Sequence, residues 1–331
     1  MNRRQVLRGA VVAAAAAGLG AGCTEPPPPP SDEVVDPGKP VAQPTPTPSR
    51  EPAPLSGAPA ASATAATRPA VAVPIRVTAE TSPAGVAAAD VLYQEYAESG
   101  TLHVTAVFQS RDSTRVGPVT EIRPVDIRSI AVLRPFVAYS GGPTGFLSQF
   151  SQSGLKGVTP GQRSEAFSSG YTSTAALYKA MPAGSLAPPA IFDYAEAGTP
   201  LASQDIAPAS QLTVAAPGHP TQVWQYDAAT STWRGRLGRT TVAAASVVVL
   251  TMPYRTLEVR KPSFRSMPGA TVFGEGSALA VSGPSSAKAH WRKTGMKLVC
   301  NITDTVGNLI RPRPGPAWVV YAPTTAKVTV K

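Results

Sequence analysis

DVLYQEYAESGTLHVTAVF, residues 90–108, contains two apolar runs separated by Glu98-Ser99-Gly100. Runs of this length, rich in β-branched and aromatic residues and joined by a turn with glycine, predict a β-hairpin. In the first run Val91, Tyr93 and Glu95 occupy alternate positions, and alternate side chains of a strand share one face. The hairpin therefore predicts a sheet on which a phenol and a carboxylate project side by side.

Helices and strands alternate around this hairpin up to about residue 182. A strand is expected at residues 69–73. Residues 124–133 predict a helix, because proline favours the first helical position and the run stops before Arg134-Pro135. A strand at residues 136–139 and a helix capped within 172–174 come next. This alternation predicts a domain that mixes both element types around one sheet.

Residues 182–210 are proline-rich and polar, as expected of a connection between domains. Beyond them the pattern is mostly one of strands, expected at Gln222–Tyr226, Ser246–Leu250, Leu298–Ile302 and Ala317–Tyr321. We therefore predict an α+β fold. An N-terminal mixed α/β sheet domain at residues 68–205 is followed by a β-rich C-terminal domain at residues 206–331.

Residues 1–22 have the layout of an export signal. Arg3 and Arg4 resemble the paired arginines of a bacterial twin-arginine signal. The apolar run Gly9–Gly22 is shorter than the roughly 20 residues that a membrane-spanning helix needs. Residues 19–23 resemble a lipoprotein processing site, at which Cys23 receives acyl chains such as palmitate. We expect a lipoprotein anchored on the extracytoplasmic face of the cell membrane, because two or more acyl chains give a stable anchor.

Residues 23–67 predict a disordered linker. They contain no aromatic residue and almost no large aliphatic one, so they bury too little apolar surface to offset their ordering entropy. Their proline density favours a semi-rigid spacer of about 3.1 Å per residue. The linker would hold the folded region away from the membrane.

The net charge of +10 belongs to the folded region. Residues 1–22 contribute three arginines and residues 24–67 a net −3, so the region from Arg68 onward carries the full excess of +10. Outside the cell this favours anionic lipid headgroups or anionic wall polymers, and solubility alone is an equally good reading. Nucleic acid is not expected, because no basic run interleaves with aromatic residues. Cys300 has no second cysteine to pair with once Cys23 is acylated, and its apolar surroundings predict a buried, inert thiol.

A set of short motifs is shared with a known bacterial family. In chain order they are DVLYQE (90–95), AVFQS (106–110), VGPV (116–119), RP (123–124), GG (141–142), GYTST (170–174), WQYD (224–227), WR (233–234), GEG (274–276), HWRK (290–293) and PGPAW (314–318). In their order and spacing they resemble the YerB-like lipoprotein family, a pair of domains of unknown function. The resemblance implies an exported lipoprotein of two domains and supplies no reaction.

The chain departs from the family pattern at several positions. His103 stands where the family usually has arginine, and Thr120-Glu121 stand where it has Arg-Ser. A His-Asp pair that the family has after the region of Arg234 is missing. If a family activity depends on these positions, we expect this member to have altered or lost it.

Motifs for known chemistries give little. His103, His219 and His290 have no cysteine or acidic partner at ligand spacing, so neither a metal nor another cofactor is expected. Ser153-Gly154-Leu155-Lys156 and Lys293-Thr294-Gly295 match two of the three penicillin-binding motifs. The flanking glycines argue against the helix that the first motif requires, so we interpret both matches as chance.

One cluster remains as a candidate ligand cleft. Its members are Tyr93, Glu95, Arg123, Asp126, Tyr139, Gly141 and Gly142. Strand ends that open into glycine-rich turns are common ligand sites, because glycine lets backbone N–H groups approach a ligand. The alternative is that Glu95 and Arg123 form a structural ion pair.

Two classes of function are therefore open. The leading one is a non-catalytic binding or scaffold protein of the cell envelope, whose partner is a wall polymer or an envelope protein. The second is a hydrolase or transferase acting on cell-wall glycan or peptide, with Glu95 as acid or base and Arg123 holding an anionic group.

Overall fold

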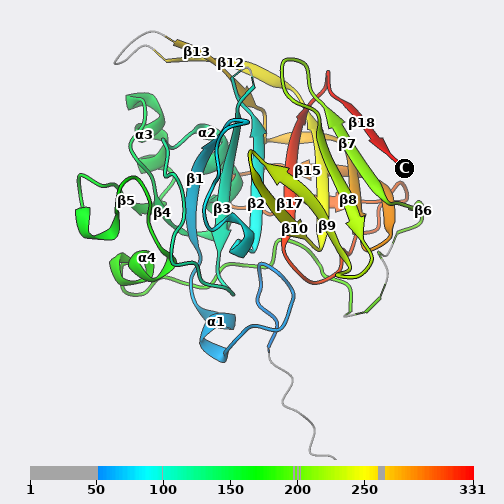
Figure 1. Ribbon diagram of the computed structural model, residues 1–331, viewed down its shortest axis with the longest axis horizontal. Coiled ribbons are helices and arrows are strands. Elements are labelled where there is room, and N and C mark those ends of the chain that lie inside the picture. Colours follow the sequence, from blue (N-terminus) through cyan, green and yellow to red (C-terminus); the bar gives the residue numbers. More distant parts are fainter. Residues whose placement is uncertain (1–50, 99, 197, 200, 202, 260–264) are drawn as a thin grey trace, which may run out of the picture. The chain divides into compact units, whose positions relative to one another are not determined.

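The computed structural model describes residues 51–331 apart from residues 99, 197, 200, 202 and 260–264 (Figure 1). The predictions for the export signal and for the lipidation site, on Arg3, Arg4 and Cys23, lie outside the described residues. None of the helices in the described ranges is long and apolar enough to cross a membrane.

Helices are few and short. They are α1 (Ala63–Thr67), α2 (Pro124–Ile130), α3 (Thr144–Gln152) and α4 (Thr174–Ala180), with 3-10 turns at Val86–Ala88, Ala131–Leu133 and Ser164–Ala166. The predicted helix at residues 124–133 is thus α2 continued by a 3-10 turn, and the predicted helix capped within residues 172–174 is α4. Ser173 caps α4, because its hydroxyl accepts a hydrogen bond from Ala176 N.

Most strands belong to one large sheet. It holds β1 (Val71–Val77), β2 (Val91–Tyr96), β3 (Leu102–Phe108), β4 (Phe136–Ala138), β5 (Lys156–Val158), β6 (Ile206–Pro208), β11 (Ser246–Met252), β14 (Gly274–Ser282), β15 (Ser285–Lys293), β16 (Asn301–Thr303) and β17 (Ala317–Pro323). Their order is β16-β15-β14-β11-β17-β2-β3-β1-β4-β5, and β6 pairs with β15.

Two smaller sheets complete the fold. One has the order β10-β9-β8-β7-β18, from β7 (Gln211–Ala215), β8 (Gln222–Asp227), β9 (Thr232–Leu237), β10 (Thr240–Ala244) and β18 (Lys327–Val330). The other is the hairpin of β12 (Tyr254–Val259) and β13 (Arg265–Ala270). The α+β prediction is confirmed, with a mixed N-terminal region and a β-rich C-terminal one.

The predicted hairpin lies in the middle of the large sheet. β2 and β3 pair antiparallel from Val91 opposite Val107 to Tyr96 opposite Leu102. On its other side β2 pairs in parallel with β17, Ala317 lying opposite Val91. Strands from both sides of the predicted division at residue 205 therefore share one sheet, and the described residues from Glu51 to Lys331 belong to one compact unit.

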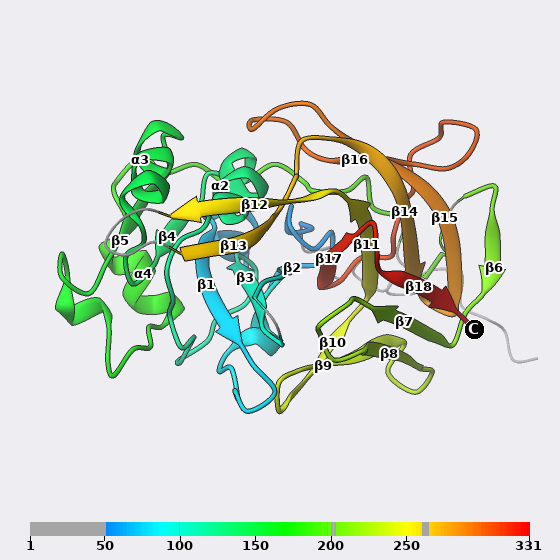
Figure 2. The same ribbon diagram turned by 90° about the horizontal axis from the view of Figure 1, so that it is seen from above.

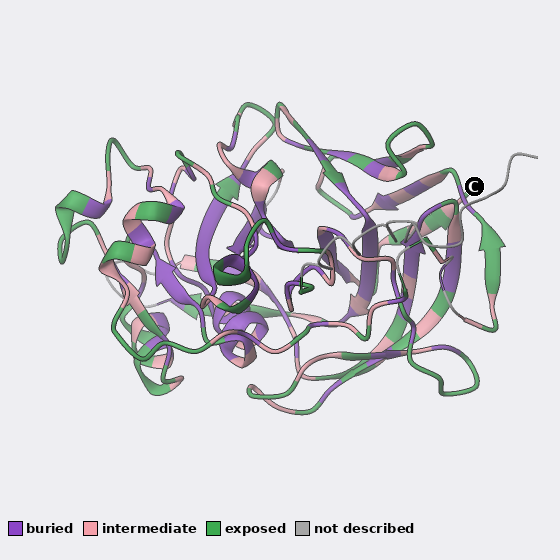
Figure 3. Ribbon diagram, turned by 90° about the horizontal axis from the view of Figure 1, so that it is seen from below, coloured by how far each residue is buried: buried purple, intermediate pink, exposed green. Residues whose placement is uncertain are grey.

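The large sheet is covered on both faces. Helices α2 and α3 lie on one face, and the five-stranded sheet lies against the other (Figure 2). Trp224 of β8 and Trp318 of β17 meet between the two sheets, with ring centroids 5.2 Å apart. Figure 3 shows the central strands in the buried colour, whereas β6 at the edge is exposed. Strand alternation therefore sends the side chains of β2 into two different cores.

The linker prediction is wrong for residues 51–67. Leu55 is fully buried, its N–H donates to Gln109 Oε1 at 3.3 Å, and its carbonyl accepts a hydrogen bond from the Tyr194 hydroxyl. Four alanines of this segment form a small core of their own: Ala53, Ala60, Ala65 and Ala66. The prediction rested on the average composition of residues 23–67. It gave no weight to a single leucine and a group of small side chains, which can pack closely against an existing surface.

Candidate functional site

Glu95 and Arg123 meet, as the sequence predicts. Nη1 of Arg123 lies 3.9 Å from Oε2 of Glu95, and Nη2 lies 2.8 Å from Oε1 of Glu98. The N–H of Ala270, at the end of β13, donates to Oε1 of Glu95 at 2.7 Å. A strand, the start of a helix and the β12–β13 hairpin thus converge on one carboxylate.

Asp126 belongs to the same group. His103 lies opposite Glu95 in the β2–β3 register, so both side chains point to the helical face. Nε2 of His103 lies 2.8 Å from Oδ1 of Asp126, and the backbone N–H of Arg123 donates to Oδ2 of Asp126 at 2.7 Å. Asp126 therefore fastens the first turn of α2 to β3, which is a structural role.

This cluster is buried. Its geometry therefore fits a structural ion pair between Glu95 and Arg123 better than an open ligand cleft. Glu95 and Arg123 are each 2 % exposed. Burial raises the pKa of Glu95 to about 7, although His103, the Ala270 N–H and Arg123 act in the opposite direction. A raised pKa beside a second carboxylate is typical of an acid catalyst, but such a group must reach its substrate. A substrate would reach Glu95 only if the β12–β13 hairpin moved.

The other predicted cleft residues are distributed around this cluster. The ring of Tyr139 packs against Phe150, with centroids 4.9 Å apart. The carbonyl of Gly141 accepts a hydrogen bond from Ile122 N at 3.0 Å, and a side chain at Gly142 would press against the Ile122 backbone. The glycine turn therefore supports the segment before α2. Tyr93 points into a separate pocket.

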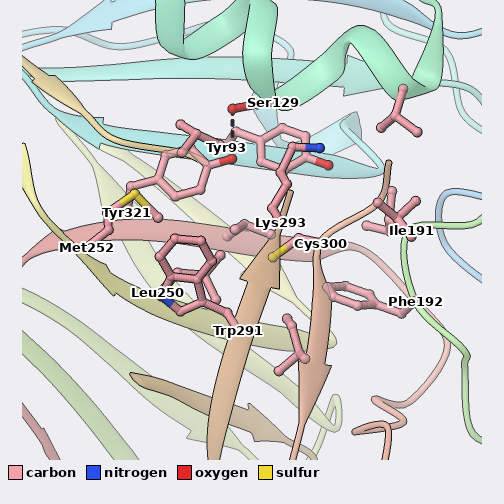
Figure 4. Close-up of a pocket in the computed structure, with 15 residues that line it drawn as sticks. Tyr93, Ser129, Ile191, Phe192, Leu250, Met252, Trp291, Lys293, Cys300 and Tyr321 are labelled. Atoms are coloured by element: carbon pink, nitrogen blue, oxygen red, sulfur yellow. Dashed lines mark hydrogen bonds between the residues drawn. The ribbon is translucent and has the colours of Figure 1, made fainter. Parts of the chain in front are cut away.

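That pocket, which we call the Lys293 pocket after one residue of its wall, lies between α2 and the strands β2, β17 and β15 (Figure 4). Its cavity volume is about 40 Å³, which is room for a few water molecules. Aromatic and aliphatic side chains form most of its wall, among them Tyr93, Phe192, Leu250, Met252, Trp291 and Tyr321. Its apolar wall is typical of small-molecule sites in proteins, but at this volume the wall must move apart to admit a ligand larger than a few water molecules.

Lys293 brings a cationic group into this apolar wall. Its side chain is 4 % exposed, and its Nζ donates to the carbonyl of Leu298. Burial lowers the pKa of Lys293. No carboxylate lines the pocket, and no ion pair to Lys293 occurs among the described residues. A buried amine with donors left over is costly without a partner.

Most other polar groups of the pocket have partners. The Tyr321 hydroxyl donates to Ser129 Oγ at 2.8 Å, Ser129 donates to the Val125 carbonyl at 2.6 Å, and Trp291 Nε1 donates to the Thr251 carbonyl at 2.9 Å. The hydroxyl of Tyr93 makes no hydrogen bond to another described residue. The remaining Nζ donors of Lys293 and this hydroxyl are therefore the groups left to contact a ligand.

Cys300 also lines the pocket, but it is not a nucleophile. Burial raises the pKa of its thiol to about 11, against the opposing effect of Lys293. The thiolate needed for attack is therefore scarce at neutral pH. Cys300 is half-buried rather than buried, because the predicted strand at residues 298–302 begins only at Asn301 and Leu298 is exposed.

The match with known proteins agrees with this fold. Residues 55–185 match the family model described as "Protein of unknown function (DUF3048) N-terminal domain". This part of the chain belongs to the DUF3048 family. The crystal structure of YerB from Bacillus subtilis is similar at a TM-score of 0.64 and 16 % identity, covering 84 % of this chain and 99 % of that one. No curated protein sequence matches the chain.

Three of the positions at which the sequence departs from the family pattern, His103, Thr120 and Glu121, lie at or beside the buried cluster. His103 pairs with Asp126. Glu121 accepts a hydrogen bond from Arg265 at 2.6 Å and lies 3.8 Å from Arg123. The hydroxyl of Thr120 is buried without a partner among the described residues. None of these three residues lines the Lys293 pocket.

Sequence reasoning missed the pocket, although one signal was present. In β15, Trp291 and Lys293 are buried while Arg292 between them is exposed. A lysine on the apolar face of an alternating strand is unusual and marks a functional candidate. The match of Lys293-Thr294-Gly295 to a penicillin-binding motif instead suggested acyl-enzyme chemistry for this lysine. The other motif of that match, at residues 153–156, forms no helix, because α3 ends at Gln152 and Gly154 has a φ of +79°.

Proposed function

We propose that this chain is a non-catalytic binding protein of the cell envelope and that the Lys293 pocket is its ligand site. The observation that carries the proposal is Lys293 itself, a buried lysine at the wall of an apolar pocket with no carboxylate beside it. A bound anion would supply the missing partner. The binding free energy would then include relief of the desolvation cost of the amine.

The pocket favours one class of ligand, an anion with an apolar or aromatic body. Lys293 and the Tyr93 hydroxyl offer hydrogen-bond donors to a carboxylate, sulfonate or phosphate oxygen. Trp291 and Phe192 offer ring faces to the rest of the molecule. Among the described residues, no carboxylate and no histidine lines the pocket, which supports binding over hydrolysis or group transfer. For these reasons the hydrolase or transferase using Glu95 and Arg123 is the weaker proposal.

The proposed location is the extracytoplasmic face of the cell membrane, through lipid on Cys23. It is supported by the paired arginines and by the short apolar run before Cys23. Cys23→Ser should move the protein from the membrane fraction to the soluble fraction, as immunoblotting of fractionated cells measures. Equal retention of the variant in the membrane would refute the anchor and leave the pocket proposal untouched.

The ligand class is tested with two fluorescent probes of similar body. 1-Anilinonaphthalene-8-sulfonate carries an anionic group, and N-phenyl-1-naphthylamine does not. Lys293→Met should weaken binding of the sulfonate about tenfold, the size expected for one charge-assisted hydrogen bond, and change binding of the neutral probe less than about twofold. Lys288→Met, a change at an exposed lysine of the same strand β15 that does not line the pocket, should leave both affinities as they are.

Folding controls accompany the probes. Lys293→Met removes a buried amine and should leave the unfolding midpoint equal or higher, so a lost affinity would not reflect lost structure. Equal weakening of both probes, or no weakening of either, would contradict an anion site at Lys293.

A further inference from the structure

A second hollow lies at the β4–β5 edge of the large sheet. Its volume is about 570 Å³, and it is bounded by β4, β5, the end of α3 and residues 182–186. It shares only Val132 with the Lys293 pocket. The hollow is therefore a separate feature of the surface, and we call it the edge groove.

Three cations line the edge groove, and they come from three separate segments. Arg134 follows the 3-10 turn after α2, Lys156 begins β5, and Lys297 lies in the connection between β15 and β16. All three are exposed, and no carboxylate lines the groove. None of the three has an ion-pair partner among the described residues. Convergence of like charges without a counter-charge raises the local concentration of anions.

Arg134 is held in place at this edge. Its backbone has a φ of +52°, a left-handed conformation that residues other than glycine adopt rarely. Its Nη2 donates to the carbonyl of Ala187 at 2.8 Å, which fixes the guanidinium against the 182–187 segment. A prepositioned guanidinium loses less side-chain entropy on binding a phosphate than a free one.

We propose that the edge groove binds an extended polymer of phosphate groups. Single exposed cations contribute little each, so one isolated phosphate would bind weakly. A chain of phosphates can contact all three cations at once, and its affinity then rises through effective concentration. The occupant is thus a polyanion lying along the groove. The inference does not depend on the proposed function of the Lys293 pocket.

The test uses long-chain sodium polyphosphate and two variants with equal net charge. The groove variant is Arg134→Gln/Lys156→Gln/Lys297→Gln. The control variant is Arg236→Gln/Lys288→Gln/Lys327→Gln, at exposed positions outside the groove. Calorimetric titration should show affinity at least about tenfold weaker for the groove variant and less than about twofold weaker for the control. Raising the NaCl concentration should weaken wild-type binding, because these charges are exposed.

Further arms separate the sources of phosphate. Inorganic phosphate should bind far more weakly than the polymer, and vesicles of phosphatidylglycerol should bind both variants alike. Equal losses in both variants would show that net charge alone acts, and a loss confined to the vesicles would assign the groove to lipid headgroups. Either result, or no binding of polyphosphate by the wild type, would overturn the proposal. Lys156→Gln/Lys297→Gln replaces the triple variant if loss of the Arg134 contact lowers the unfolding midpoint.

Discussion

Oε2 of Glu95 lies 3.9 Å from Nη1 of Arg123, in a place that water scarcely reaches. The pair joins the central strand β2 to the first residue before α2, and β13 closes over it. Arg123 also contacts Glu98 and Glu121, so one cation is shared among three carboxylates. Such an arrangement is sensitive to the removal of either partner, and it makes the stability of the protein depend on pH.

Glu95→Gln should remove a pH dependence of folding stability. The pKa of Glu95 is raised from about 4.5 to about 7, so the folded state keeps a proton that the unfolded state releases between these values. The stability of the wild type therefore falls as pH rises through this window, by at most about 3 kcal/mol from this group. Urea unfolding at pH 5, 6, 7 and 8 should show the variant gaining on the wild type as pH rises.

Glu98→Gln is the matched control. Arg123 and the hydrogen bonds to Glu98 lower the pKa of that carboxyl despite the opposing effect of its burial. Its contribution to stability is therefore present above its unfolded pKa and is lost only as pH falls below about 4.5. The wild type and this variant should run parallel from pH 5 to pH 8. A constant difference for Glu95→Gln as well would show that Glu95 does not titrate in the window.

Arg123→Met should destabilise the protein by about 3–5 kcal/mol, because it leaves Glu95 buried without its cation. The loss should be smaller at pH 5 than at pH 8, since Glu95 can take up a proton. Arg265→Met removes a guanidinium that is 38 % exposed and pairs with Glu121, and should change stability by less than about 1 kcal/mol. Denaturant titration of both variants measures the contrast, and equal losses would contradict the buried role of Arg123.

Local pattern was sufficient for the elements of the N-terminal half. Strand alternation in residues 90–108 and the proline at the start of α2 identify elements through interactions between near neighbours. The pairing of β2 with β17 joins residues more than two hundred positions apart, and no local signal specifies that neighbour. The single shared sheet therefore could not be read from the sequence.

The candidate site shows the same division. Glu95, Arg123 and Asp126 lie close together in the chain, and their meeting could be predicted. Their burial could not, because it depends on Ala270 and the β12–β13 hairpin. Lys293 reaches Tyr93 and Tyr321 only through the sheet order β15-β14-β11-β17-β2, so its pocket appears only in three dimensions.

Trp318→Phe should destabilise the protein more than Trp224→Phe. Both tryptophans are fully buried and pack on each other, so the two changes remove similar volume. Nε1 of Trp318 donates to the buried Gln94 Oε1 at 3.0 Å, whereas Nε1 of Trp224 has no partner among the described residues. The difference should be about 1–3 kcal/mol, the cost of leaving a buried acceptor unpaired. Guanidinium unfolding measures it, and equal losses would mean that the Gln94 contact contributes nothing.

Leu55→Ala should show whether residues 51–67 are part of the folded unit. The Leu55 side chain is fully buried, so its truncation should weaken the packing of this segment on the rest of the protein by about 2–5 kcal/mol. The backbone hydrogen bond from the Tyr194 hydroxyl to the carbonyl of residue 55 remains available in the variant. Elastase, which cleaves after small residues, should then cut the alanine-rich segment 51–67 faster than in the wild type, as mass spectrometry of the fragments measures. Leu186→Ala, at a leucine that is 63 % exposed, should leave the cleavage rate as it is. Rapid cleavage of residues 51–67 in the wild type itself would contradict their packing on the folded unit and support the original prediction of a linker.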